Sequence, residues 1–461
     1  MYILHIDLIA SALLTRFYMK VTVQKKSLRK IEGVKPRSLQ KMCLSLLSSD
    51  DAELLFPELA DTLLFCIKLL HETLEVNGVK KVFFLSREGQ PLKQMFDLYC
   101  DRVGVRVQSH YLEVSRRSTL LPSFTSLAEE RYETLFRQYR SMSLLEFLSS
   151  LGLESYCTEL SKELGLSDSQ TANRLGDFPS SELFSRLKVL PRFIAIYDHE
   201  RLARRAAFLR YLITLSDGEI PADLVVVDVG WKGTIQDNLF AMLCREPNSV
   251  VTSVTGYYIG LIDQGAAGPN NRKHGLLFSS VNGHTPRFHV FNENRALFEI
   301  LLAADHGSVA SYEMDMNGQA RVVHGSFDEQ EMLENFVFPV QRNIFERYSQ
   351  MLDYTTMDVE SHTPLVKDVA LSHARLVFHP SQAELEWFST VFHVENYGVF
   401  ERSFFTAADA VPPLLERLKF MLTVLKRSGR GALGFWPWKK LSERVGRPVA
   451  ALYGLIRFFQ K

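Results

Sequence analysis

The sequence predicts an α/β protein built on a parallel β-sheet, with a helical insertion lobe and a mainly helical C-terminal region. Short apolar runs have the length and composition of buried strands, at residues 79–85, 105–114, 224–227 and 250–261. Helical patterns alternate with these runs, which is typical of strands that pair in parallel. Between the second and third runs, residues 125–215 carry helical patterns almost throughout and therefore predict an inserted lobe.

The first two strands each end in a polar loop. A helix is predicted over 54–74, from apolar residues at helical spacing, before the run 79–85. That run ends abruptly in the loop Ser86–Gly89, and a helix over 91–99 follows. The second run ends in the loop Ser115–Ser118, which contains two adjacent arginines.

The third strand leads into the most informative loop. Its four apolar residues, 224–227, are followed by Asp228 and then by a loop that ends at Thr234, before a helix predicted over 235–243. The run 250–261 predicts one more strand. We divide the chain into an N-terminal segment, a two-part α/β core, the insertion, a mainly helical region and a basic tail, at residues 1–54, 55–124 and 216–315, 125–215, 316–430 and 431–461.

Charge and cysteine usage exclude several classes of protein. The 53 basic and 53 acidic residues give a formal net charge of zero, which argues against a protein that coats nucleic acid. The five cysteines are scattered, so neither a CxxC metal site nor a disulfide framework is expected. Charged residues interrupt the apolar N-terminus, and neither a spanning helix nor a signal peptide is predicted. A cytoplasmic location follows from these features.

The loop from Asp228 to Thr234 has the composition of an anion-binding turn. Its two glycines, Gly230 and Gly233, allow backbone N–H groups to turn toward an anion at a helix N-terminus. The Lys232 ammonium and the Thr234 hydroxyl are further donors. The spacing is not that of a Walker A loop. An ordinary strand-to-helix turn with a surface lysine is the competing interpretation.

The other two loops carry similar chemistry. Ser86 and Arg87 suit phosphate oxygens, Glu88 suits a metal or a hydroxyl, and Gly89 permits close approach of the backbone. For Ser86–Gly89 the competing interpretation is a polar turn between strand and helix, and for Arg116-Arg117 it is a solvated basic edge. Loops at the carboxyl ends of parallel strands meet in one crevice, so we expect the three to converge.

Together the segments FLSREG, SRRS and VDVGWKGTIQ, with Phe298-Glu299 and His306-Gly307-Ser308-Val309 downstream, resemble a known family. Their order is similar to that of phosphoribosyltransferases. It is closer still to bacterial polysaccharide-biosynthesis proteins often labelled predicted haloacid-dehalogenase-like hydrolases. In those proteins a phosphatase-like half is joined to a half resembling a phosphoribosyl-transferring glycosyltransferase. The resemblance covers residues 55–315 and is to the second half.

The resemblance implies a Rossmann-like, phosphoribosyltransferase-like sheet and a glycosyltransferase activity. The 5-phosphoribosyl group of phosphoribosyl pyrophosphate would pass to a bacterial surface-polysaccharide acceptor, free or lipid-linked, with release of pyrophosphate. A partner phosphatase would then remove the 5-phosphate. Mg²⁺ is the implied cofactor. Asp228 and Glu88 would be catalytic and would hold the metal, and the substrate-binding residues would be Ser86, Arg87, Gly89, Arg116, Arg117, Gly230, Trp231, Lys232, Gly233, Thr234, Glu299 and His306.

The chain departs from these families in two ways. Nucleotide-forming phosphoribosyltransferases usually have two adjacent acids before the phosphate loop, and here Asp228 is followed by Val229. A haloacid-dehalogenase-like hydrolase, the first alternative function, needs an Asp-x-Asp pair, and no two aspartates have that spacing. A non-catalytic subunit of a glycan assembly complex is the second alternative. For Glu299, a surface ion pair with Arg295 is the simpler interpretation.

The C-terminal end is strongly basic. From Arg417 to Lys461 there are eleven Lys or Arg and one acid, Glu443, with Trp436 and Trp438 between them. Two interpretations stay open. The tail lies on an anionic membrane surface, which would make the protein peripheral at the inner membrane, or its helix docks on the core and displays its charges.

Overall fold

The computed structural model describes most of the chain beyond the N-terminal segment. The described residues are 54–105, 107–137, 139–244, 249–357, 366–396, 400–404, 413–425 and 433–460. The predicted N-terminal segment therefore lies outside them except for Leu54. None of the helices within these ranges is long and apolar enough to cross a membrane.

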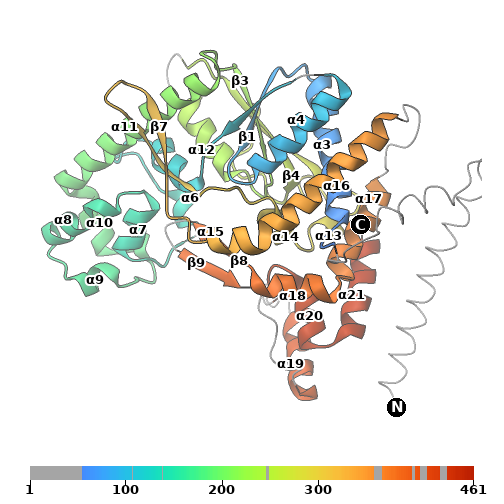
Figure 1. The fold of residues 1–461 in the computed structure, drawn as a ribbon. Helices are drawn as coiled ribbons and strands as arrows, with labels where there is room; N and C mark the ends of the chain where they lie inside the picture. Colours follow the sequence, from blue (N-terminus) through green and yellow to red (C-terminus); the bar gives the residue numbers. More distant parts are fainter. Residues whose placement is uncertain are drawn as a thin grey trace, which may run out of the picture.

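A five-stranded parallel sheet forms the centre of the molecule, as the sequence predicts (Figure 1). The strands lie in the order β2-β1-β3-β4-β5, and all neighbouring pairs are parallel. Their bounds are β1 (Lys81–Leu85), β2 (Gln108–Leu112), β3 (Asp223–Asp228), β4 (Ser253–Leu261) and β5 (Asn271–Ser279). The edge strand β5 was not predicted, because polar residues fill its first half and hide the apolar pattern that follows.

The strand order reverses between β1 and β3. From β1 the chain moves outward to β2, then returns to place β3 on the other side of β1. The loops that leave the carboxyl ends of β1 and β3 therefore diverge to opposite faces of the sheet and leave a crevice between them, which is where open α/β sheets bind ligands.

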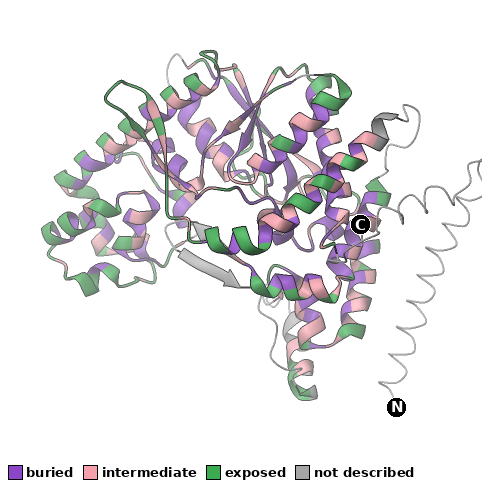
Figure 2. Cartoon of the chain, in the orientation of Figure 1, coloured by how far each residue is buried: buried purple, intermediate pink, exposed green. Residues whose placement is uncertain are grey.

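Side chains of the central strands alternate between two cores. Val82 and Phe84 belong to one cluster of buried side chains, while Phe83 and Leu85 belong to the other, as the pleat requires. On the first face lie α3 (Glu58–Val76) and α4 (Gly89–Val103), with α16 (Phe338–Met357) packed on them. The second face carries α5 (Arg116–Ser123), α11 (Pro191–Leu215) and α12 (Thr234–Leu243). Both faces of the sheet are buried (Figure 2).

The insertion is helical and has a hydrophobic core of its own. Its elements are α6 (Glu133–Phe136), α7 (Leu144–Ser150), η2 (Glu154–Tyr156), α8 (Cys157–Glu163), α9 (Asp168–Ala172), η3 (Phe178–Ser180) and α10 (Glu182–Val189), followed by α11. Helix α11 contributes Phe193 and Tyr197 to the lobe but Phe208 and Leu212 to the sheet. One 25-residue helix, which ends at Leu215, thus belongs to both parts.

The remaining elements follow β5 along the chain. They are α13 (Phe288–Phe291), α14 (Ala296–Leu301), the hairpin β6 (Val309–Met314) and β7 (Ala320–His324), α15 (Gln330–Met332), η4 (Leu333–Val337), α17 (Val366–Phe378), α18 (Gln382–Thr390), the hairpin β8 (Phe392–Asn396) and β9 (Phe400–Phe404), α19 (Leu414–Leu425), α20 (Pro437–Arg444) and α21 (Arg447–Phe459). The predicted helices are present, but the sequence analysis missed both hairpins. The strands β6 and β7 are short and half-exposed, so little apolar alternation marks them.

The end of the basic tail is part of the main core. Trp436 and Trp438 are buried, and the Trp436 indole N–H donates to the Val377 carbonyl at 2.9 Å. The Trp438 backbone N–H donates to Glu293 Oε1 at 2.8 Å. The two tryptophans therefore dock on the core, which was one of the two interpretations of the tail. On α21 one apolar row, Leu452, Ile456 and Phe459, is 47–60% exposed, so this row is a candidate for contact with a membrane surface.

We expect Trp436→Ala to destabilise the whole protein by about 3–5 kcal/mol, because it empties a packed aromatic site and leaves the Val377 carbonyl without its donor. Phe459→Ala is the matched control, since that ring is 60% exposed and its loss should change stability by at most about 0.5 kcal/mol. Urea denaturation measures both. Equal stability of the two variants would show that the tail does not dock.

Glu293 is a buried carboxyl under the docked tail. Burial raises its pKa to about 8, although Trp438 N–H, the Tyr453 hydroxyl and Arg457 act in the opposite direction. The folded state therefore keeps a proton that the unfolded state has already released above its ordinary pKa of 4.5. This difference makes stability fall as pH rises from about 4.5 to about 8.

We expect Glu293→Gln to remove much of this pH dependence, since the amide cannot titrate. Melting temperatures of the parent and the variant, measured between pH 4.5 and pH 8.5, test this. The parent should lose stability more steeply than the variant as pH rises. Parallel curves would mean that Glu293 is ionised throughout the range.

Candidate active site at the carboxyl ends of the strands

A cleft lies where the loops after β1, β2 and β3 meet. It encloses about 710 Å³, counting its open mouth. Seven of the residues predicted from the sequence line it: Ser86, Arg87, Glu88, Arg116, Asp228, Gly230 and Glu299. Residues from all three loops therefore lie in one cleft, as the sequence predicts. The remaining predicted residues lie behind or beside the cleft, and their contacts show why.

The loop after β1 is fixed to the end of β2. The Ser86 hydroxyl donates to the Val114 carbonyl at 2.5 Å and accepts from the Val114 N–H at 2.8 Å. Both of these hydrogen bonds join the Ser86 side chain to the backbone of Val114. At Gly89 a Cβ would lie 2.8 Å from the carbonyl carbon of Phe84, so the glycine lets α4 begin close against the strand and does not itself face the cleft.

Arg87 has a buried acidic partner that the sequence analysis missed. Its Nη1 donates to Glu329 Oε2 at 2.6 Å, and the two side chains are only 11% and 7% exposed. Burial acts against the charge of Arg87, but Glu329 outweighs it and raises the pKa of the guanidinium. Glu329 lies 242 residues away along the chain, so no local pattern pointed to it.

The two adjacent arginines point to different places. Ser115 caps α5 through a reciprocal capping box with Ser118, so the predicted loop is the first turn of a helix. Arg116 lines the cleft. Arg117 is turned by about 100° on the helix and pairs instead with Glu154 of the insertion lobe. Arg117 was expected to bind substrate together with Arg116, but it is not among the residues that line the cleft.

Asp228 is a buried carboxyl at the end of β3. Its Oδ1 accepts the Val229 N–H at 2.7 Å, and Oδ2 has no hydrogen-bond partner within the described part of the chain. Burial raises the pKa of Asp228 well above its ordinary value. The charge of Glu88 raises it further and Glu299 adds to this, while Val229 N–H and Arg116 oppose the shift. The cleft thus brings three carboxyl groups, Glu88, Asp228 and Glu299, together with Arg87 and Arg116.

The loop from Gly230 to Thr234 is shaped by close contacts. Gly230 has φ +145°, and a Cβ there would lie 2.3 Å from the Gly260 carbonyl oxygen. Gly233, with φ +66°, packs against Tyr258 and Lys273. These glycines permit the backbone path, as predicted, but neighbouring strands and not a ligand impose the need for them. Two peptide bonds in the site are cis, Ser86–Arg87 and Gly230–Trp231.

Lys232 does not reach the cleft. Its side chain is exposed, and its carbonyl accepts a 2.9 Å hydrogen bond from Lys273 Nζ. Lys273 is buried and pairs with Asp237 at 2.7 Å; burial lowers its pKa. Thr234 opens α12 beside the cleft, and Ile235 lines it. Lys273, which the sequence analysis did not identify, is therefore the lysine whose side chain holds this loop in place.

Trp231 and Glu299 form a pair of their own. The indole N–H donates to Glu299 Oε1 at 2.6 Å, and the Arg295 guanidinium lies over the indole ring, 5.2 Å from its centroid. All three residues are half-buried. The charge of Glu299 opposes the effect of burial, which lowers the pKa of Arg295, so the expected interaction between Arg295 and Glu299 is present and also includes Trp231. Glu299 still lines the cleft.

His306 lies outside the cleft that Ser308 lines. Its Nε2 is 2.7 Å from the Tyr111 hydroxyl, and its Nδ1 is 2.9 Å from the Gly307 carbonyl.

Comparison with known family models found no match to the chain, and comparison with curated proteins found none either.

We expect Gly230→Ala to destabilise the protein by at least about 1–3 kcal/mol, since the added methyl collides with the Gly260 carbonyl and the backbone conformation suits only glycine. Gly268→Ala is the control, because nothing lies within 4 Å of a Cβ there. Chemical denaturation compares the two. A Gly230→Ala protein as stable as the control would mean that the loop does not approach β4 so closely.

Proposed function

We propose that the chain is a phosphoribosyltransferase-type glycosyltransferase. It transfers 5-phosphoribosyl from phosphoribosyl pyrophosphate to a bacterial surface-polysaccharide acceptor. The observation that carries the proposal is the convergence of Glu88, Arg116 and Asp228 in one cleft at the reversal point of a parallel sheet. The loop order that resembles phosphoribosyltransferases adds to it.

The residues of the cleft fit a divalent cation. Burial and the charge of Glu88 raise the pKa of Asp228. Both effects disfavour the ionised carboxylate, and a bound cation would favour it. Glu88 and Asp228 are the ligands we assign to Mg²⁺, which usually binds through one or two carboxylates plus substrate phosphates. Within the described residues these carboxylates do not form a three-ligand group, in keeping with a metal that the donor completes. When bound, Mg²⁺ neutralises the leaving pyrophosphate.

The reaction breaks the bond between the ribose C1 and the pyrophosphate oxygen, and pyrophosphate leaves with the electron pair. An acceptor hydroxyl oxygen then bonds to C1 and loses its proton. Asp228 suits this proton by its position in the cleft, and its Oδ2 has no hydrogen-bond partner within the described residues, whereas Oδ1 accepts the Val229 N–H. Arg116 offers charge-assisted hydrogen bonds to phosphate oxygens.

The 5-phosphate fits the start of α12. The helix has ten residues and begins at Thr234, after Gly233 in the left-handed region. Its first backbone N–H groups lack partners within the helix and favour an anion. Because the Lys232 side chain is exposed, we assign the phosphate contact to the backbone and Thr234, and give Lys232 no more than a long-range role.

The two alternatives differ in what they predict. A haloacid-dehalogenase-like hydrolase would release phosphate from simple phosphate esters, and the absence of an Asp-x-Asp pair argues against it. A non-catalytic subunit would not bind the donor. In our proposal a separate phosphatase removes the 5-phosphate of the product. We place the reaction in the cytoplasm, with the exposed apolar row of α21 as a contact to the inner membrane.

We expect the purified protein to bind phosphoribosyl pyrophosphate with Mg²⁺ and to release pyrophosphate when a panel of sugar glycosides is supplied. Asp228→Asn should lower that rate by about 10², the scale of losing a general base, without lowering the melting temperature. Loss of a transition-state contact should change donor affinity less than rate. Glu159→Gln, an exposed carboxylate of the insertion lobe paired with Arg192, is the control.

Two results would contradict the proposal. A parent protein that shows no donor binding in isothermal titration calorimetry, with or without Mg²⁺, is not such an enzyme. Normal turnover of Asp228→Asn together with a lower melting temperature would make Asp228 a structural partner of the Val229 N–H. Phosphate release from p-nitrophenyl phosphate by the parent would favour the hydrolase.

A further inference from the structure

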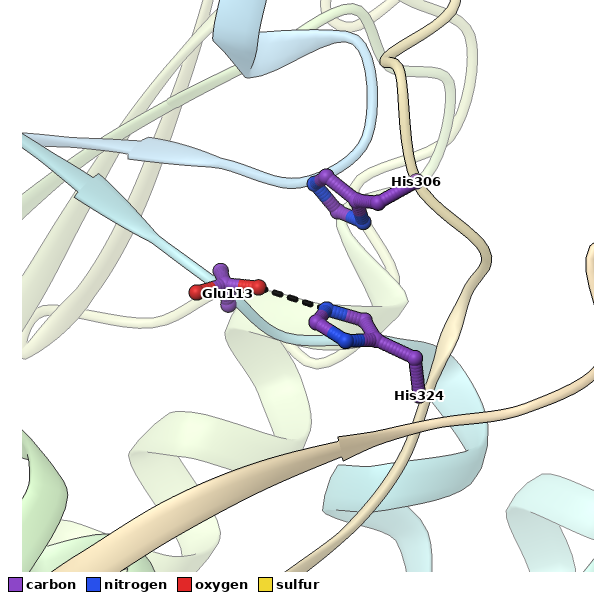
Figure 3. A group of neighbouring side chains, drawn as sticks. All are labelled: Glu113, His306 and His324. Atoms are coloured by element: carbon purple, nitrogen blue, oxygen red, sulfur yellow. Dashed lines mark hydrogen bonds and ion pairs between the residues drawn. The ribbon is translucent and has the colours of Figure 1, made fainter.

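A second group of polar side chains lies beside the cleft. Glu113 follows β2, His306 lies in the segment after α14, and His324 ends β7. One potential ligand atom from each lies within 4.8 Å of the others. Within the residues that the structure describes, no other three His, Cys, Asp or Glu side chains come together in this way. Figure 3 shows the two rings and the carboxylate gathered around one space.

The side chains of the group already face one another through a hydrogen bond that a cation would replace. His324 Nε2 lies 2.6 Å from Glu113 Oε2, and the rings of His306 and His324 are 4.7 Å apart between centroids. The 2.6 Å separation requires a proton between the two atoms, so His324 Nε2–H donates to Glu113 Oε2. In the other neutral tautomer of His324, Nε2 carries a lone pair and can bind a cation beside the carboxylate. A cation at that point satisfies all three at once.

The surroundings hold the ligands as metal sites require. A histidine that binds a metal usually donates from its other ring nitrogen to a neighbouring acceptor or hydroxyl. His306 meets this condition whichever nitrogen binds, since Tyr111 Oη lies against Nε2 and the Gly307 carbonyl against Nδ1. Two hydrogen bonds also hold the backbone at Glu113. Its N–H donates to Tyr211 Oη at 3.0 Å, and its carbonyl accepts from Tyr312 Oη at 2.6 Å.

We propose that Glu113, His306 and His324 bind one Zn²⁺ ion, with a fourth position open to solvent. The two-histidine, one-carboxylate donor set is that of zinc sites with an open position, and imidazole donors select zinc over Mg²⁺. Zinc bonds of about 2.0–2.2 Å in a tetrahedral site place ligand atoms roughly 3.3–3.6 Å apart, so Glu113 Oε2 and His324 Nε2, now 2.6 Å apart, must separate slightly. Side-chain rotation allows this, because Glu113 and His324 are 26% and 36% exposed.

The ion would join three segments that border the cleft. Glu113 directly precedes Val114 and Ser115, and His306 lies two residues before Ser308; these three neighbours line the cleft. Zinc would therefore hold the β6–β7 hairpin against β2 and stabilise one wall of the cleft. This inference does not depend on the proposed transferase activity, since its test measures metal binding alone.

The test uses the full-length, untagged protein after treatment with a chelator. Zn²⁺ is titrated by calorimetry in the presence of excess Mg²⁺, and we expect one ion bound per chain. His324→Ala and Glu113→Gln should each weaken binding by at least about 100-fold, because loss of a ligand exceeds the 10–100-fold cost of losing a partner behind it. His199→Ala, an exposed histidine of α11, is the control and should bind as the parent does.

A thermal scan gives the second measurement. Zn²⁺ should raise the melting temperature of the parent and of His199→Ala, because it binds the folded state, and should leave that of His324→Ala unchanged. The proposal is overturned if the parent binds no stoichiometric Zn²⁺. It is also overturned if folded His324→Ala and Glu113→Gln bind as tightly as the parent, in which case the three side chains form only a hydrogen-bonded link between the hairpin and β2.

Discussion

The burial of a carboxyl group at the end of the central strand is the constraint on which the rest of the site depends. β3 lies between β1 and β4, and helices cover both faces of the sheet, so Asp228 has no route to bulk water except through the cleft. A buried carboxyl is costly unless partners compensate for it. The Val229 N–H and the charge of Arg116 compensate in part. The remaining imbalance favours a ligand with a cation in the cleft.

Many side chains that look suited to a ligand hold the loops in place. Ser86 bonds to the backbone of Val114, Arg87 pairs with Glu329, and Trp231 bonds to Glu299. These contacts fix the loops before any ligand arrives, and a site fixed in advance loses less entropy on binding. Arg116, Glu88 and Asp228 also line the cleft, and α12 begins beside it.

The C-terminal region supports the site from behind. Glu329 neutralises Arg87, and the tail packs Trp436 and Trp438 into the same core that underlies the first face of the sheet. A basic and aromatic tail can therefore be read from the sequence as a membrane element and still be a structural one. The buried indoles decide this for the tryptophans, because a ring enclosed in the core is not available to a lipid surface.

The sequence by itself determined the parallel sheet, the helical insertion and the three loops, because apolar runs, helical spacing and loop chemistry are local properties. It also determined that Asp228 and Glu88 follow strands and so share an edge. Only the tertiary structure decided which residues face the cleft. Arg117 and Lys232 turn away, and Glu329 and Lys273 enter as partners, because ion pairing joins residues distant along the chain. For the same reason His324 and Glu113, separated by 211 residues, became neighbours only when the β6–β7 hairpin packed against β2.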